Sequence, residues 1–259
     1  MAIYLLIAFL GALCGFFSGL LGIGGGIIMA PLLLYIPPLL GFESLSMHTV
    51  AGLTIVQGLV ACISGVIVHK RFNSVSSRLA GWMGTTIFIA ALFGGAGSEF
   101  ASQHLLLMLL GVLALLAAIL MLKPSAKEKK TPPVSEISFS LWRAISTAGS
   151  VGVLGGMVGQ GGSFILIPLM TSFVRIPTRI AIGSNLAIVL LSTTAGFLGK
   201  AVTGQIEWLL SVPIVLTVIP ATQIGGMLSH KVPVVKLRKI LGVLIAVAAV
   251  RILISAFWG

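Results

Sequence analysis

Two stretches of this chain repeat one pattern: residues 15–32 read GFFSGLLGIGGGIIMAPL, and residues 152–169 read GVLGGMVGQGGSFILIPL. Aligned without a gap, the two stretches pair Gly22 with Gly159 and bring other glycines and a late proline into register. In both stretches, glycines interrupt an apolar run at the same points. A duplicated hydrophobic helix with matching breaks is the strongest sequence indication of a transporter's binding site. The duplication also predicts that each half of the chain forms one structural unit.

The composition places these stretches in a membrane. Hydrophobic residues make up 58% of the 259 residues and charged residues only 8%, against about 25% charged residues in a soluble domain. Nearly the whole chain consists of apolar runs of about 20 residues, which as helices cross roughly 30 Å of hydrocarbon. Because lipid offers no hydrogen-bond partners, the backbone of each run must be helical. The sequence therefore predicts an all-α, polytopic (multi-pass) integral membrane protein in the lipid bilayer of the cell inner (cytoplasmic) membrane.

The apolar runs are organised as two halves around a polar linker. They cover residues 1–40, 47–68, 79–97, 104–122, 139–173, 181–199, 208–228 and 239–258. We predict repeat 1 over 1–122, a cytoplasmic linker rich in Lys, Pro and Ser over 123–138, and repeat 2 over 139–259. Segments 1–40 and 139–173 are too long for one crossing. Each is predicted to turn back at its glycines, which gives each half a re-entrant or hairpin segment and three transmembrane helices.

The basic residues decide between two topologies. If each long segment crossed the membrane only once, the Lys- and Arg-rich loop 229–239 would lie outside. If both long segments return to the side they entered, every Lys and Arg except Lys200 and Arg251 lies inside. The positive-inside rule favours this second topology, in which three crossings per half make the repeats inverted. The net charge of +11 is then a topology signal, and no nucleic acid is expected as a partner.

Inverted repeats bring their two broken helices together on a pseudo-two-fold axis near the middle of the membrane. A helix that restarts after a break presents unpaired N–H groups and the positive end of its dipole. Two such ends together form a site for a small anion without buried Lys or Arg. The predicted substrate-binding residues on the breaks are Gly22, Ile23, Gly24, Gly25, Gly26, Gly159, Gln160, Gly161, Gly162 and Ser163.

Polar residues of the following spans extend this predicted site. After the breaks the halves align again in a second register, which pairs Thr54 with Asn185, and Gln57 and Ser184 lie close to them in sequence. A buried amide needs hydrogen-bond partners, whereas the hydroxyl of Thr54 can bond its own helix. Asn185 is therefore harder to explain by packing alone. We predict that Thr54, Gln57, Ser184 and Asn185 contribute to substrate binding.

Other features have packing or anchoring explanations. Gly15 and Gly19 form a small-xxx-small pair suited to close helix packing, and Cys14 and Cys62 are expected in the core. Arg251 lies within the last span, where an arginine is a functional candidate but can also extend to the interface. Neither a metal, a cofactor nor catalysis is expected from the residue spacings. The polar residues near span ends are expected at the membrane interface: His48, His69, His104, Lys200 and His230.

The paired motifs resemble those of a known family. GxxSGLLGIGGGxxxxPLL at 15–33 and GxxGGMVGQGGSFxxxPLM at 152–170 are similar to the motifs of the TauE/SafE family of sulfite exporters, which includes 4-toluene sulfonate uptake permease-type anion carriers. The resemblance covers both repeats in motif, spacing, duplication and length. It implies a carrier for sulfite, thiosulfate, sulfoacetate or a related sulfonate, bound by the two glycine breaks together with Thr54 and Asn185.

The sequence thus predicts a secondary transporter that carries a small sulfur-containing anion by alternating access. The residues alone indicate a small anion, and the resemblance supplies the sulfur chemistry. The alternatives are a carrier of another small anion, a carrier of a cation or metal, and a membrane assembly protein without transport activity; an enzyme is not expected. The direction of transport and the coupling ion stay open, as does the oligomeric state, for which a homodimer is one option.

Overall fold

The structure, a computed structural model, has the predicted all-helical architecture. It describes residues 2–24, 26–97, 103–122, 133–134, 137–158, 163–202, 204 and 206–258. The helices are α1 (Ala2–Leu21), α2 (Gly26–Leu39), α3 (Met47–Arg71), α4 (Ser77–Gly97), α5 (Gln103–Leu122), α6 (Leu141–Val158), α7 (Ser163–Leu169), the π-helical turn η3 (Met170–Val174), α8 (Thr178–Val202), α9 (Trp208–Lys231) and α10 (Val234–Trp258). These bounds lie close to those of the predicted apolar segments.

Described helices lie on either side of both glycine-rich stretches, of which Gly25 and residues 159–162 lie outside the described part of the chain. Helix α1 ends at Leu21 and α2 begins at Gly26, while α6 ends at Val158 and α7 begins at Ser163. In the described part of the chain, α1, α8 and α9 and residues Thr49–Arg71 of α3 are long and apolar enough to cross a membrane. The arms that follow the breaks are shorter apolar helices.

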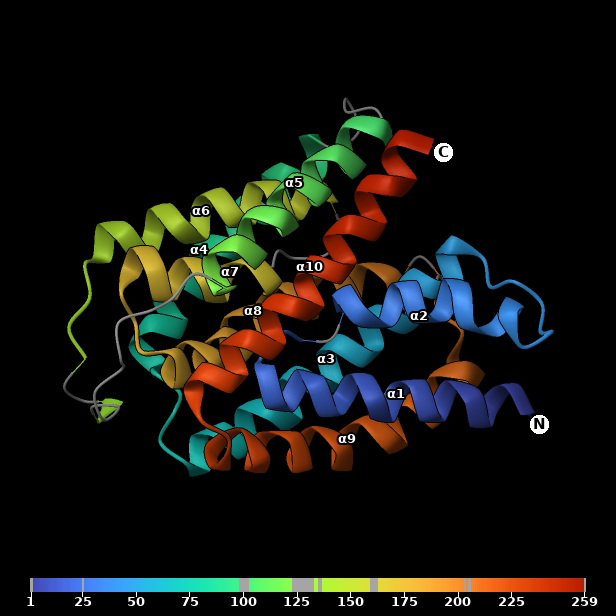
Figure 1. Ribbon diagram of the computed structural model, residues 1–259, viewed down its shortest axis with the longest axis horizontal. Helices are drawn as coiled ribbons and strands as arrows, with labels where there is room; N and C mark the ends of the chain where they lie inside the picture. The colour runs from blue at the N-terminus through green and yellow to red at the C-terminus, as the bar shows by residue number, and fades with distance from the viewer. Residues whose placement is uncertain are drawn as a thin grey trace.

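The connections gather at two ends of the molecule. In Figure 1, α3, η3 and α9 all end at the left, where α4, α8 and α10 begin. The N-terminus, the α2–α3 connection and the end of α10 lie at the right. We call the left end the basic end and the right end the termini end. The basic end carries Lys70, Arg71, Arg78, Arg175, Arg179, Lys231, Lys236, Arg238 and Lys239.

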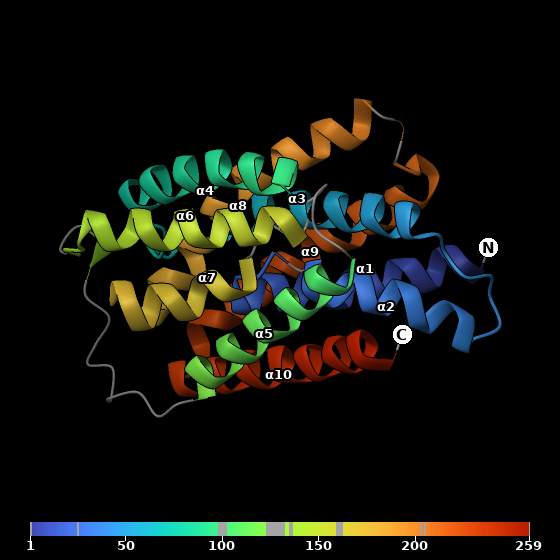
Figure 2. The same ribbon diagram turned by 90° about the horizontal axis from the view of Figure 1, so that it is seen from above.

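Glycines let two pairs of helices pack backbone against backbone. Helix α1 lies along α9, and α4 lies along α6 (Figures 1 and 2). A Cβ atom added at Gly19 would collide with the carbonyl of Thr222, and one at Gly94 with the carbonyl of Val153. At Gly15 the nearest atoms, Val218 Cα and its carbonyl oxygen, would lie at 3.0 Å. The predicted packing role of the small residues on α1 is therefore confirmed.

The buried side chains form two main cores. One lies among α1, α2, α3 and α9, which we call the first bundle. The other lies among α4–α8, η3 and α10, the second bundle, and also takes up Leu20, Leu21 and Ile23 at the end of α1. Between the bundles, α3 and α8 share a small cluster that includes Cys62 and Leu186. Cys14 and Cys62 are both buried, as predicted.

Replacing Gly19 by alanine should separate α1 from α9. We expect Gly19→Ala to lower the free energy of unfolding by about 1–3 kcal/mol, because its methyl group meets backbone that cannot move aside cheaply. Gly81→Ala in α4 is the matched control, since its methyl group would have no neighbour within 4 Å. The control should leave stability unchanged or raise it by up to about 1 kcal/mol. Unfolding in detergent, followed by circular dichroism, measures the free energy of unfolding of both variants. Equal effects of the two substitutions would contradict the close α1–α9 packing.

Candidate functional site

Asn185 and Ser163 join the end of α1 to the start of α7. The side-chain amide of Asn185 on α8 donates to the carbonyl oxygen of Gly22 at 2.6 Å and to that of Ser163 at 3.1 Å. The hydroxyl of Ser163, the first residue of α7, donates to the carbonyl oxygen of Ile23 at 2.8 Å. Asn185 is 0% exposed. The end of α1, the start of α7 and the middle of α8 therefore meet in the interior.

Left-handed glycines make these contacts possible. Gly22 has φ = 72° and Gly24 has φ = 68°, a conformation that costs glycine little. The N–H group of Gly22 still donates to the carbonyl oxygen of Ser18 and so closes the last turn of α1. The carbonyl groups at the end of a helix have no partner within it. Asn185 and Ser163 supply such partners where water would otherwise be needed.

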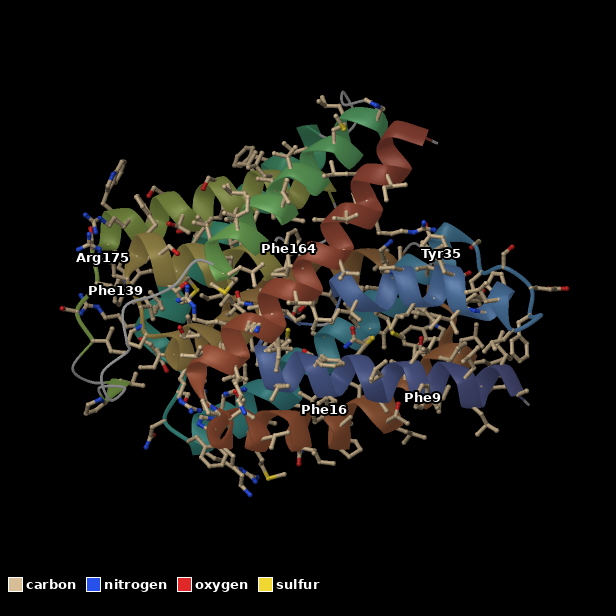
Figure 3. The ribbon with its side chains drawn as sticks, viewed as in Figure 1. Phe9, Phe16, Tyr35, Phe139, Phe164 and Arg175 are labelled. Carbon is tan, nitrogen blue, oxygen red and sulfur yellow. The ribbon has the colours of Figure 1, made fainter. Side chains whose placement is uncertain are left out.

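A cavity of about 550 Å³ reaches these breaks. Gly24 and Gly26 of the first break line it together with Ser163 of the second. The lining residues of α3 come from its N-terminal half and those of α8 from its C-terminal half, both of which lie toward the termini end (Figure 1). The cavity therefore extends from the breaks toward the termini end. Figure 3 shows Phe164, the second residue of α7, well inside the molecule and far from Arg175 at the basic end.

Hydroxyl groups and one cationic side chain give the cavity its polarity. Thr54, Ser163, Ser192 and Thr193 are among its lining residues, as is Lys200 near the end of α8. Ser192 and Thr193 donate to the carbonyl oxygen of Val189 on their own helix, at 3.1 and 3.0 Å. The hydroxyl of Thr54 is buried and has no hydrogen-bond partner among the described residues. The hydroxyl of Thr54 thus keeps hydrogen-bonding capacity that the described residues leave unused, whereas the α8 hydroxyls already donate to their own helix.

Two buried amides carry atoms that the described residues leave without partners. Gln57 is 0% exposed, and neither its Oε1 nor its Nε2 has a hydrogen-bond partner in that part of the chain. The same holds for Oδ1 of Asn185. Unpaired buried polar atoms are rare in folded proteins and often mark ligand or catalytic positions. Gln57 follows Thr54 by one helical turn on α3, although it does not line the cavity.

The structure separates Ser184 from the other predicted residues. Its hydroxyl accepts a hydrogen bond from the N–H group of Ser76 at 2.9 Å, toward the basic end, and it is absent from the cavity lining. Gly22 and Ile23 contribute carbonyl groups to the junction, while Gly24 and Gly26 line the cavity. Five predicted residues lie outside the described part of the chain: Gly25, Gly159, Gln160, Gly161 and Gly162.

One of the residues expected at the interface is buried in the interior. The prediction is wrong for His69, which is 1% exposed and whose Nε2 donates to the carbonyl oxygen of Gly19 at 2.9 Å. Lys200 lines the cavity. The register that pairs Thr54 with Asn185 also pairs His69 with Lys200, a signal that could have drawn attention to both. Arg251 lies over the ring of Tyr35 at 4.5 Å, near the termini end (Figure 3), which fits an anchoring role.

Arg179 links the two bundles at the basic end. Its guanidinium on α8 donates to the carbonyl oxygen of Ser229 at 2.6 Å and to that of Val232 at 2.9 Å, both at the end of α9. Carbonyl groups at a helix C-terminus carry partial negative charge and attract a cation. A short distance away, the ring of His69 lies 5.3 Å from that of His230. The cavity thus lies on the termini side of the junction, and Arg179 links the two bundles at the basic end.

Comparison with known proteins identifies the family. The profile described as Sulfite exporter TauE/SafE matches residues 7–252. The chain belongs to the TauE/SafE family. Relatives named as probable membrane transporter proteins include YunE of Bacillus subtilis, 22% identical over 87% of this chain and 86% of the relative, and a Xylella fastidiosa (strain Temecula1) protein, 26% identical over 94% and 92%. MJ0441 of Methanocaldococcus jannaschii is 22% identical over 93% and 92%. No solved structure matches significantly.

Membership confirms the predicted resemblance and the coarse functional class. TauE/SafE proteins form a family of membrane transporters and are not an enzyme family. The family and the apolar helices together make this TauE/SafE protein a multi-pass membrane protein.

Removing the Asn185 amide should loosen the junction of the breaks. Asn185→Ala leaves the carbonyl groups of Gly22 and Ser163 without this donor, so we expect the free energy of unfolding to fall by about 1–3 kcal/mol. Thr194→Ala on the same helix is the control, because its exposed hydroxyl bonds only the carbonyl oxygen of Leu190. That control should change stability by less than about 0.5 kcal/mol. Thermal unfolding in detergent compares the two, and a junction that tolerates Asn185→Ala as well as the control would argue against this role.

Proposed function

We propose that this TauE/SafE protein is a secondary transporter that carries a small sulfur-containing anion across the cell inner membrane by alternating access. Sulfite, thiosulfate, sulfoacetate and related sulfonates are the proposed substrates. One observation carries the proposal: residues beside both predicted breaks line a single cavity, since Gly24 and Gly26 lie at the first and Ser163 follows the second.

The chemistry of the cavity favours an anion. Helices α2 and α7 both begin at lining residues, Gly26 and Ser163, so the N–H groups of their first turns lie beside the cavity. Such groups and the helix dipole favour negative charge. The charged residue in the described lining is Lys200, a cation. A carrier of cations or metals uses carboxylates, imidazoles or thiolates in its path instead.

The pairing of helices supports inverted repeats. If α1–α5 are exchanged for α6–α10, the α1–α9 pair becomes the α6–α4 pair, while α3–α8 and α5–α10 map onto themselves. The directions agree with a two-fold axis: in Figure 2, α1 runs from the termini end toward the interior and α6 runs from the basic end. Exchanging the conformations of the two halves would produce a second state that is open at the basic end.

The two bundles are the units that would move in this exchange. Each has its own core, and α3 and α8 meet through a small cluster beside the cavity. The glycine-packed pairs α1–α9 and α4–α6 stay within one bundle each. A rocking motion of the bundles about the breaks would open the basic end once the bonds of Arg179 to α9 release. In such a mechanism, ligand binding shifts the balance between states that already exist.

Transport in proteoliposomes tests the substrate class. We expect saturable uptake of sulfite, thiosulfate or sulfoacetate, and a loss of about 10-fold or more in Thr54→Val, because a hydrogen bond to a charged ligand disappears. Thr85→Val on α4 is the control, since its exposed hydroxyl bonds its own helix through the carbonyl oxygen of Gly81. Vesicles that carry a metal or alkali cation but none of these anions would overturn the proposal.

Thiol labelling tests the role of Arg179. In a background with Cys14→Ala and Cys62→Ala, Arg179→Met should populate the state that is open at the basic end. Labelling of Ser184→Cys from the basic end should then rise severalfold, and labelling of Ser192→Cys from the termini end should fall, since one end closes as the other opens.

Arg78→Met is the matched control for this labelling. The Arg78 guanidinium lies 5.6 Å from the ring centre of Phe139, so it does not join α8 to α9. If Arg179→Met and Arg78→Met give the same labelling pattern, Arg179 does not hold the basic end shut.

A further inference from the structure

We infer that His69 and His230 form a proton-binding site at the basic end, and that a proton bound there weakens the Arg179 link between the two bundles. The inference rests on the proposed alternating-access function and deepens it, because it names the ligand that controls opening at this end. The site is separate from the cavity at the helix breaks, since neither histidine is among the described lining residues.

Four helices meet around the two histidine rings. His69 lies near the end of α3, is 1% exposed, and donates through Nε2 to the carbonyl oxygen of Gly19 on α1 at 2.9 Å. On α8, a Cβ atom added at Gly183 would lie 3.2 Å from the Cβ atom of His69. The ring of His230, near the end of α9, lies 5.3 Å from that of His69 and stacks on that of Phe72 at 4.1 Å. A change of charge on either ring therefore acts where the two bundles meet.

Each ring has a buried nitrogen atom without a hydrogen-bond partner in the described part of the chain, Nδ1 in His69 and Nε2 in His230. The carbonyl oxygen of Gly19 can only accept, so Nε2 of His69 carries a hydrogen atom and the neutral ring has its lone pair on Nδ1. Imidazole is the side chain that ordinarily changes its charge between about pH 5 and pH 8. Two positive rings this close would repel each other, so the pair binds a single proton.

Arg179 is the charge that a bound proton meets first. It faces the ring of His230 from α8 and acts on it electrostatically. The other Lys and Arg residues of the basic end are exposed, where water and salt screen them, except Arg238, which bonds a carbonyl group of α5. Helix α1 has no charged residue, and the two described glutamates, Glu43 and Glu207, precede α3 and α9 at the opposite ends of these helices. No carboxylate of the described residues therefore balances a proton on the pair.

A bound proton has opposite effects on the contacts between the bundles and within one bundle. Arg179 bonds the carbonyl oxygens of Ser229 and Val232, which lie on either side of His230 in sequence. A positive His230 ring repels the guanidinium and competes for the negative end of the α9 dipole. A positive His69 instead strengthens its bond to α1, which lies in the same bundle. The proton thus favours the state in which Arg179 is released.

The sign of the pH dependence follows from linkage. Because the proton favours the state with Arg179 released, that state also binds the proton more tightly. The basic end should therefore open as the pH falls through the range in which the pair takes up its proton.

Distances between spin labels test this dependence. We place labels at two exposed positions of the basic end, Met227→Cys on α9 in the first bundle and Ser77→Cys on α4 in the second, in a background with Cys14→Ala and Cys62→Ala. Double electron–electron resonance in liposomes measures the distance between them. From about pH 8 to about pH 5, the ratio of long to short distances should rise about 10-fold.

Substitutions of the histidines separate charge from structure. His230→Gln and His69→Gln cannot take up the proton, so the short distances should persist at low pH. His230→Arg carries a permanent charge, and the long distances should dominate throughout the pH range. His104→Gln is the matched control, because it removes an exposed histidine on α5 that is not part of the pair, and it should respond to pH as the wild type does.

The variant Arg179→Met tests the route by which the proton acts. Without the link, the long distances should already dominate at about pH 8, and lowering the pH should add little. If Arg179→Met keeps the full response to pH, the proton does not act through Arg179 and the inference is overturned.

The outcomes distinguish this inference from the transport function. A wild-type protein that carries sulfite but shows the same distances at every pH overturns the proton site and leaves the transport function standing. A response to pH in His230→Gln as large as in His104→Gln does the same. A wild-type protein that carries none of the proposed anions overturns the transport function, and the distances still decide whether the histidine pair controls the basic end.

Discussion

The hydrogen bonds of Asn185 and Ser163 to the broken end of α1 are the contacts on which the rest of the structure depends. Carbonyl groups freed by a helix break cannot remain unpaired in hydrocarbon, since each would cost several kcal/mol. The break at Gly22–Gly24 is therefore tolerable only where another helix supplies donors or where it lines a water-filled cavity. The same contacts fix the start of α7 against the end of α1, which determines where the cavity ends.

Apolar and polar contacts occupy different places in this fold. Glycines on α1 and α9, and on α4 and α6, bring the backbones of each pair into close contact. The polar contacts lie between the bundles, at the breaks and at the Arg179 bonds to α9. A fold with closely packed apolar pairs and few polar contacts between bundles suits the two-state motion that we propose for this TauE/SafE protein.

The cavity is lined mainly by apolar residues, glycines and hydroxyl-bearing residues, with Lys200 near the end of α8. In the function that we propose, hydroxyl and backbone N–H groups would bind an anion without trapping it, which a carrier needs because its substrate must also leave. This requirement is a physical reason for the scarcity of charged side chains in the interior of the proposed pathway.

The sequence by itself determined the helices, the end of α1 at its glycines and the close packing at Gly15 and Gly19, because hydrophobic length and the freedom of glycine are local properties. It also pointed to Asn185 and Thr54, since a buried amide or hydroxyl needs a partner wherever it lies. Only the tertiary structure decided that Ser184 bonds Ser76, that His69 is buried beside Gly19 and that Lys200 lines the cavity. Which neighbour a helix face meets depends on residues that are distant in sequence, and neither periodicity nor composition carries that information.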